Sequence, residues 1–205
     1  MAAQPKERTV AQGIILRFEP GVHLSDEQFF HLCQQNRDLR LERTVEGDIV
    51  VMPPAGGRSS DRNADLTMQL RQWALSEGSG VAFDSSGGFT LPNGATLSPD
   101  AAWVLRSRLA RLTNAQKERF LPLCPDFVAE LRSPSDALGA LHDKLAEYIA
   151  NGARLGWLID PDARRVYVYR PDTPRETIDA ATHLSGDPVL PGFSLDLSRL
   201  WEPAF

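Results

Sequence analysis

Residues 98–105 read Ser-Pro-Asp-Ala-Ala-Trp-Val-Leu, and residues 125–134 read Pro-Asp-Phe-Val-Ala-Glu-Leu-Arg-Ser-Pro. Each stretch is a short apolar run with a carboxylate where the run begins or ends. A proline restricts the residue before it to extended backbone, so Pro99 predicts that Asp100 lies at the entrance of a strand. Carboxylates in such places are poor core residues and good ligands for a hard divalent cation.

Alternation along the second run predicts which side chains share a face. One face carries Asp126, Val128, Glu130 and Arg132. If the two runs are adjacent strands, Asp100 and Glu130 can hold one Mg²⁺ between them, because this ion prefers oxygen ligands and keeps several waters. The carbonyl of Leu131 is a further oxygen ligand. The alternative is a pair of solvated acids at strand ends.

The composition predicts a soluble cytoplasmic protein of one domain. The 205 residues are 42% hydrophobic and 24% charged, with a net charge of −5. We expect an N-terminal strand or arm over residues 1–24, followed by a domain over residues 25–205. No apolar run approaches the roughly 20 residues that span a bilayer, and residues 1–8 lack the apolar region of a secretory signal. Two cysteines are too few for a disulfide framework or a cysteine zinc site.

The charge is unevenly distributed along the chain. Between Leu105 and Phe120 the sequence carries five basic residues and one acidic residue. An acidic protein is not expected to coat nucleic acid non-specifically, yet this basic stretch could meet phosphate beside an acidic metal site. The alternative is an ordinary solvated surface.

Capping residues, turn residues and hydrophobic periodicity predict the elements. Helices are expected after the capping boxes at Ser25 and Thr113, over residues 61–77, and from Leu138 to a stop at Gly152. The strands are expected over residues 14–18, 39–45, 49–52, 81–83, 88–91, 101–105, 127–131, 156–160 and 165–169. Mixed strands with helices at both ends of the sheet region indicate an α/β or α+β fold. We expect the apolar stripes to share one core, formed by Leu66, Leu70, Trp73, Phe127, Leu131, Leu141, Leu145 and Trp157.

Two residues, Arg132 and Lys144, are candidates for the positively charged catalytic side chain. Arg132 lies on the face of Glu130, but its pKa is too high for a base, so its expected role is to clamp phosphate. Lys144 flanks a predicted apolar stripe that includes Tyr148, so its amine could reach the edge of the sheet. The alternative for Lys144 is a surface lysine paired with Glu147 or Tyr148.

Several motifs, taken in their order along the chain, resemble a known family. They are Glu46-Gly47-Asp48-Ile-Val-Val-Met, Ser98-Pro99-Asp100, Pro125-Asp126-Phe-Val-Ala-Glu130, Ser133-Pro134-Ser135-Asp136, Lys144…Tyr148…Gly152 and Trp157-Leu-Ile-Asp-Pro161. Over about residues 25–200 the chain resembles the Uma family of restriction-endonuclease-like proteins, within the PD-(D/E)XK nuclease superfamily. The resemblance implies a central mixed sheet flanked by helices, Mg²⁺ dependence with Mn²⁺ as a substitute, DNA as substrate, and oligomerisation.

The resemblance also implies site residues. Asp100 matches the first acid of the family motif and Glu130 the second. Arg132 occupies the usual lysine position, and Lys144 would replace that lysine from the helix. Accessory roles are expected for Glu42, Asp126 and Tyr148, with Glu42 preferred to Glu46. Residues 58–63 lack the histidine that family members often carry in this helix.

Three functions remain open at this stage. The first is a Mg²⁺-dependent DNA endonuclease. The second is a nuclease-fold protein without cleavage activity that acts as a nucleic-acid-binding or regulatory module. The third is a metal hydrolase of a small phosphorylated substrate. We also expect a homodimer or higher homo-oligomer, because residues 191–201 alternate without an obvious hairpin partner and cleavage of both strands generally needs two active sites.

Overall fold

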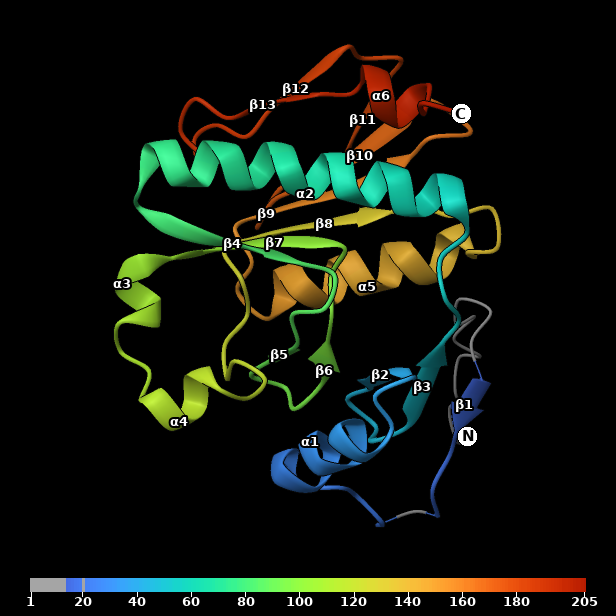
Figure 1. Cartoon of the computed structure of the whole chain (residues 1–205), viewed down its shortest axis with the longest axis vertical. Helices are drawn as coiled ribbons and strands as arrows, with labels where there is room; N and C mark the ends of the chain where they lie inside the picture. Colours follow the sequence, from blue (N-terminus) through green and yellow to red (C-terminus); the bar gives the residue numbers. More distant parts are fainter. Residues whose placement is uncertain (1–13, 20) are drawn as a thin grey trace.

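The structure is a computed structural model of the chain, and it describes residues 14–19 and 21–205 (Figure 1). Within these residues the strands form a six-stranded main sheet, a five-stranded second sheet and a two-stranded hairpin. The predicted N-terminal arm lies partly outside the described residues. Its described part contains β1 (Ile14–Leu16), which pairs with β3 (Ile49–Met52) and so belongs to the second sheet.

The main sheet is mixed, as expected. In spatial order it contains β11 (Glu176–Asp179), β10 (Arg165–Tyr169), β9 (Leu155–Asp160), β8 (Phe127–Leu131), β7 (Ala101–Leu105) and β4 (Gly80–Asp84). β8 and β9 run parallel, with Ala129 opposite Trp157, and the other neighbours pair antiparallel. The parallel pair exists because a long helix connects these two strands.

Two long helices cover opposite faces of the main sheet (Figure 1). α2 (Gly57–Glu77) packs on one face through Leu66 and Leu70, and α5 (Leu138–Ala150) packs on the other through Leu141 and Leu145. The expectation of a single core is therefore wrong. The sheet separates two cores, because the side chains of β8 alternate: Phe127, Ala129 and Leu131 face α2, whereas Val128 faces α5.

The second sheet packs against the first helix. Its spatial order is β1, β3, β2 (Arg40–Arg43), β6 (Thr96–Leu97) and β5 (Phe89–Thr90). α1 (Asp26–Gln35) buries Phe29 against Leu41 and Ile49. The capping box predicted at Ser25 is present, with Gln28 as its reciprocal partner. The strands expected over residues 39–45 and 49–52 are present as β2 and β3, which pair antiparallel with Arg40 opposite Met52.

Other element boundaries follow local chemistry, with some differences. Two short helices, α3 (Arg106–Leu109) and α4 (Asn114–Lys117), follow β7, and α4 begins at the predicted Thr113 capping box. α2 begins at Gly57, four residues earlier than expected, because its N-cap Gly56 offers no side chain to signal the start. It ends at Gly78, whose φ of 82° is the left-handed conformation that glycine adopts readily.

The C-terminal stretch has a partner within the chain. β13 (Ser194–Asp196) pairs with β12 (His183–Ser185), and α6 (Ser198–Trp201) follows. The expectation that residues 191–201 lack a hairpin partner is therefore wrong. Leu195 and Leu200 are buried in the core that α2 covers, so the apolar alternation of this stretch is explained inside one chain. One of the two arguments for a dimer is removed.

Candidate active site

The register of the main sheet brings the two predicted acids together. Ala101 pairs with Ala129, so Asp100 comes opposite Glu130 where β7 begins and β8 ends. Directly opposite residues of an antiparallel pair point to the same face. Both residues are buried, Asp100 with 9% and Glu130 with 4% of its surface exposed. They line one cavity of about 990 Å³.

Donors from three elements surround the Asp100 carboxylate. The amide of Leu131 donates to Asp100 Oδ2 at 2.8 Å, and the amide nitrogen of Asn63 in α2 donates to Oδ1 at 3.2 Å. Nη2 of Arg40, from β2, lies 4.0 Å from the same Oδ1 atom. Asp100 is therefore held in one orientation by α2, β8 and the second sheet.

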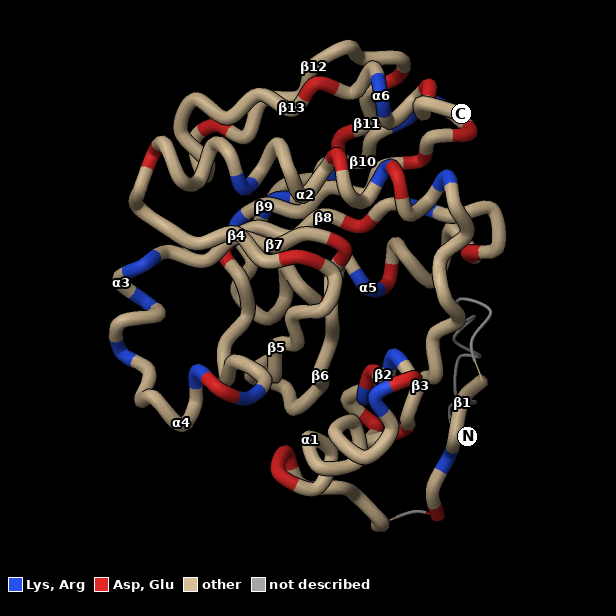
Figure 2. Tube along the Cα trace, in the orientation of Figure 1, with Lys and Arg blue, Asp and Glu red and all other residues tan. Residues whose placement is uncertain are grey.

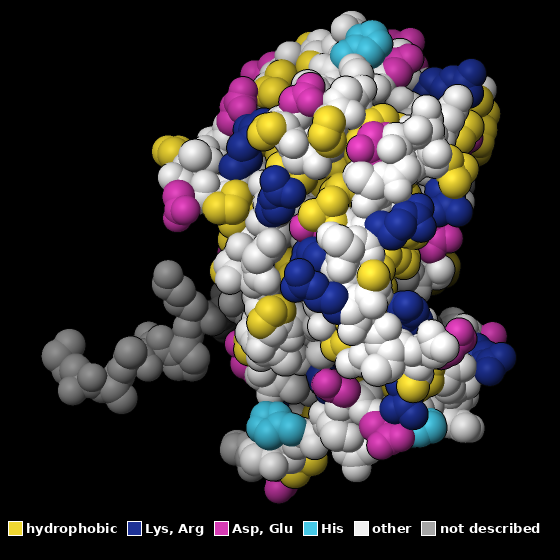
Figure 3. Space-filling model, turned by 90° about the vertical axis from the view of Figure 1, so that its left-hand side faces the viewer, with side chains coloured by type: hydrophobic (Ala, Val, Ile, Leu, Met, Phe, Trp, Pro, Cys, Tyr) yellow, Lys and Arg dark blue, Asp and Glu magenta, His cyan; other side chains and the backbone are white. Residues whose placement is uncertain are grey.

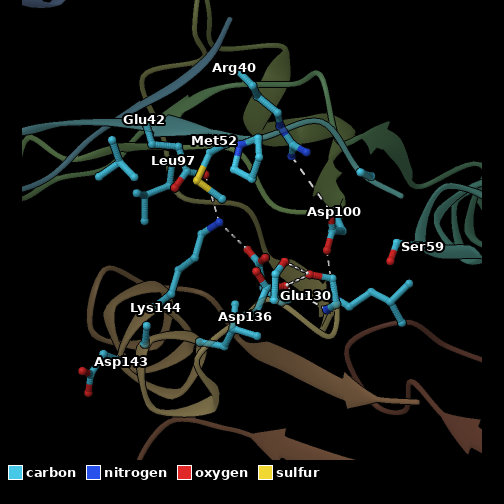
Figure 4. A pocket seen from close by; sticks show the side chains of 18 of the residues that line it. Arg40, Glu42, Met52, Ser59, Leu97, Asp100, Glu130, Asp136, Asp143 and Lys144 are labelled. Carbon is cyan, nitrogen blue, oxygen red and sulfur yellow. Dashed lines mark hydrogen bonds and ion pairs between the residues drawn. The ribbon is translucent and has the colours of Figure 1, made fainter. Parts of the chain in front are cut away.

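The amine of Lys144 lies between two carboxylates (Figure 4). Its Nζ is 2.9 Å from Glu130 Oε1 on β8 and 2.9 Å from Glu42 Oε1 on β2, and it donates to the carbonyl of Ser98 at 3.3 Å. Glu42 Oε1 also accepts the amide of Ser98 at 2.9 Å. The alternative of a surface lysine paired with Glu147 is wrong, because Lys144 faces inward.

Burial changes the ionisation of these groups. It raises the pKa of Glu130 to about 8, against the opposing effect of Lys144, and it raises the pKa of Asp100 above its usual value. For Lys144, burial alone would lower the pKa, but the carboxylates of Glu130 and Glu42 outweigh it and raise the pKa above the ordinary value. Lys144 therefore remains a cation. It can stabilise negative charge but is unsuited to act as a base.

Two predicted residues lie elsewhere. Arg132 pairs with the buried Asp160 through Nη1 at 2.7 Å, and its Nε donates to the carbonyl of Asp136 at 3.3 Å. It does not line the cavity. Asp126 lies at the opposite end of β8, where it accepts from the amide of Leu105 at 2.9 Å and pairs with Arg108 at 3.0 Å. The geometry gives neither residue a contact with the acid pair.

Tyr148 belongs to the core beneath α5. Its side chain is fully buried, and its hydroxyl has no hydrogen-bond partner within residues 14–19 and 21–205. Burial raises its pKa well above the usual value, and the charge of Glu130 adds to that effect. Tyr148 lies close enough to sense the acids but does not line the cavity. Its accessory role stays a prediction.

The basic stretch between Leu105 and Phe120 lies away from the acids. Its lysine and arginine residues belong to α3, α4 and their connections, at the end of the main sheet where α2 and α5 finish (Figure 2). The acids lie at the other end. On the side of the molecule that carries α3, cationic side chains are scattered among polar and apolar ones (Figure 3). The expectation that this stretch lies beside the acidic site is therefore wrong.

A family model named Uma2 and described as "Putative restriction endonuclease" matches residues 26–198 of the chain. The chain belongs to the Uma2 family. This confirms the resemblance found in the motifs, and it supports a nuclease function.

Among the solved structures that share the fold is the crystal structure of a putative nuclease belonging to DUF820 from Anabaena variabilis, with a TM-score of 0.72. The two chains are 21% identical, and the match covers 87% of this chain and 97% of that chain. The expected fold class is confirmed. A comparison with curated proteins gives no match.

The candidate site includes two residues that the sequence interpretation missed. Arg40 precedes Glu42 by two positions on β2, so strand alternation places it on the same face, which lines the cavity. Asn63 lies three residues before Leu66, on the buried side of α2, and it also lines the cavity. Its spacing of three residues from the buried Leu66 is the helical-periodicity signal that could have identified it.

The residues of the candidate site fit a hard divalent cation. Within the described part of the chain, no group of three or more His, Cys, Asp and Glu residues is arranged to hold a metal ion. The site does offer two carboxylates, and Mg²⁺ is commonly bound by one or two carboxylates together with water and substrate phosphate. Two buried oxygens, Asn63 Oδ1 and Glu130 Oε1, accept no hydrogen bond of good geometry from any described residue, although Glu130 Oε1 faces the Lys144 ammonium.

None of the helices in the described part of the chain is long and apolar enough to cross a membrane.

Proposed function

We propose that this Uma2-family protein is a Mg²⁺-dependent endonuclease that hydrolyses phosphodiester bonds in DNA, with Mn²⁺ as a substitute metal. The observation that carries the proposal is the buried pair Asp100 and Glu130 facing the amine of Lys144 in one cavity. Carboxylates for a cation and a nearby fixed positive charge are what hydrolysis of a phosphodiester requires.

Each residue has a defined part in this proposal. Asp100, Glu130 and the carbonyl of Leu131 would hold the cation. The bound cation would polarise a phosphoryl oxygen and lower the pKa of water. Lys144, kept protonated by two carboxylates, stabilises the negative charge that develops on the phosphoryl oxygens. Glu42 keeps the Lys144 amine directed at Glu130.

One observation favours a second candidate, a nuclease-fold protein that binds nucleic acid without cleaving it. The Lys144 amine already faces three acceptors, namely Glu42, Glu130 and the Ser98 carbonyl. It must give up one of them to contact substrate. If the Lys144 amine keeps all three acceptors, the site could bind nucleic acid but could not stabilise the charge that develops during cleavage.

A cleavage assay with matched variants separates the two candidates. Duplex DNA, single-stranded DNA and RNA are incubated with Mg²⁺, Mn²⁺ or a chelator. We expect the wild type to cleave DNA only with metal, and Glu130→Gln to lose that activity. Glu118→Gln makes the same chemical change at an exposed residue outside the cavity and should remain active. A wild type that binds DNA but cleaves no substrate with either metal would favour the binding module.

We propose in addition that the protein acts as a homodimer or a higher homo-oligomer. The remaining support is that cleavage of both strands of a duplex generally needs two active sites. Light scattering at micromolar concentration, with and without DNA, should give at least twice the mass of one chain. A monomer under both conditions would contradict the proposal.

A further inference from the structure

Three basic residues line the cavity within the described part of the chain, and they differ in how far their donors are used. Lys144 is engaged with Glu42, Glu130 and the Ser98 carbonyl. Arg17 is 72% exposed and lies 3.8 Å from Asp48, at the outer edge of the cavity. Arg40 lies between them, next to Asp100.

Most donors of the Arg40 guanidinium have no partner among residues 14–19 and 21–205. Its Nη2 makes one long contact, 3.4 Å to the Ser98 carbonyl, and lies 4.0 Å from Asp100 Oδ1. Its Nε is buried and has no hydrogen-bond partner among the described residues. The Arg40 side chain as a whole is 38% exposed. A buried N–H group without a partner is rare in folded proteins, so the Arg40 Nε needs an acceptor, which is either water or a ligand oxygen.

The position of Arg40 indicates what that acceptor is. The side chain extends from β2 toward Asp100, on the side of the cavity where Ser59 of α2 lies (Figure 4). A ligand group bound there would contact Arg40, and the adjacent group of the same ligand would reach Asp100 and Glu130. The guanidinium is a planar fork whose parallel donors match two oxygens of a phosphate.

We propose that Arg40 binds a backbone phosphate of the nucleic acid beside the Asp100–Glu130 pair, in the role that the sequence pattern assigned to Arg132. This inference rests on the proposed function for the identity of the substrate. Arg132 is unavailable because it pairs with Asp160 outside the cavity.

The competing explanation is that Arg40 only orients Asp100. The two differ in what they predict for binding. A residue that contacts phosphate contributes to the salt dependence of binding, with a slope of about 0.7 per phosphate contact for a single strand. A residue that acts only through Asp100 should change the affinity for the cation and leave that slope unchanged.

The test measures fluorescence anisotropy of a labelled single-stranded oligodeoxynucleotide with Ca²⁺ present, over a series of salt concentrations. We expect Arg40→Gln to weaken binding about tenfold and to reduce the salt slope by about 0.7. Arg40→Lys should keep the slope while losing part of the affinity, because an ammonium cannot bind two oxygens in parallel. Arg71→Gln removes the same charge at an exposed position of α2 outside the cavity and should bind as the wild type does.

Calorimetry with Ca²⁺ alone completes the experiment, and unchanged Ca²⁺ affinity in Arg40→Gln supports the proposal. Three results would overturn it: no oligonucleotide binding by the wild type, wild-type binding by Arg40→Gln, or weaker Ca²⁺ and oligonucleotide binding with an unchanged salt slope. If binding depends on Arg40 but the wild type cleaves nothing with Mg²⁺ or Mn²⁺, the phosphate site stands and the nuclease proposal fails.

Discussion

The two ends of β8 carry buried carboxylates in contrasting surroundings. Asp126 comes just before the strand and is 3% exposed, and Glu130 comes four residues later and is 4% exposed. Asp126 accepts the Leu105 amide on one oxygen and pairs with Arg108 on the other. Glu130 faces a lysine that it shares with Glu42, and its Oε1 accepts no hydrogen bond of good geometry from the described residues.

This contrast separates an acid with structural partners from a candidate metal ligand. Both residues look alike in the sequence, because each flanks the same apolar run and alternation places them on one face. Asp126 has an amide donor on one oxygen and a paired guanidinium on the other, and it does not line the cavity. Around Glu130, burial outweighs the charge of Lys144 and raises the pKa of this carboxyl to about 8, so its ionised form is poorly stabilised without a further positive charge. Such a site gains stability from a bound cation.

The largest difference between the two ends should appear in metal binding. We expect Asp100→Asn and Glu130→Gln each to lower the affinity for Mg²⁺ and Mn²⁺ by at least about 100-fold. Changing a residue that only supports a metal ligand lowers affinity by up to about 100-fold, and the loss of a ligand itself should not be smaller. Asp126→Asn should bind as the wild type does. Calorimetry measures all three. Equal affinity in the wild type and Glu130→Gln would show that the cation site is elsewhere.

The second difference concerns the two cations of the sequence hypothesis. Lys144→Met should lower single-turnover cleavage by about 100-fold, the usual scale for a charge-stabilising group, while metal affinity is retained. Arg132→Gln should stay within a few-fold of the wild type, since this residue does not line the cavity. The reverse pattern, with activity lost in Arg132→Gln and kept in Lys144→Met, would return the catalytic role to the strand position.

The third difference concerns stability. Asp126→Asn should lower the free energy of unfolding by about 2 kcal/mol, because the half-buried Arg108 loses its negatively charged partner. Glu130→Gln should cost less, because Glu42 still pairs with the Lys144 ammonium and burial disfavours the ionised form of the carboxyl that is removed. Urea denaturation of both variants without metal gives the comparison. A more destabilised Glu130→Gln would mean that its pairing with Lys144 matters more to the fold than the Asp126 contacts do.

The smallest expected effect is at Asn63. Its amide nitrogen donates to Asp100, so Asn63→Ala should lower metal affinity or turnover by about tenfold, as residues that orient a ligand typically do. Gln72→Ala, a change at an exposed position of the same helix outside the cavity, is the control. If Asn63→Ala behaves as the control does, Asp100 is sufficiently held by the Leu131 amide.

Sequence patterns predicted the features that depend on neighbouring residues along the chain. Pro99 and the alternation of β8 placed Asp100 and Glu130 correctly, and the helical stripe of α5 placed Lys144 on the side that meets them. The fate of Arg132 could not be predicted in this way, because its partner Asp160 lies on β9 and becomes a neighbour only through the parallel pairing of β8 with β9. Arg40 was overlooked for a similar reason, since it reaches the site from the other sheet.

The Lys144 amine has an architectural consequence as well. Glu42 belongs to the second sheet and Glu130 to the main sheet, so one ammonium group tethers the two layers at the cavity. The field at the acid pair is thereby linked to the spacing between the layers. A displacement of β2 lengthens the contact between Lys144 and Glu42. The position of the Lys144 ammonium, and with it the positive charge next to Glu130, then changes.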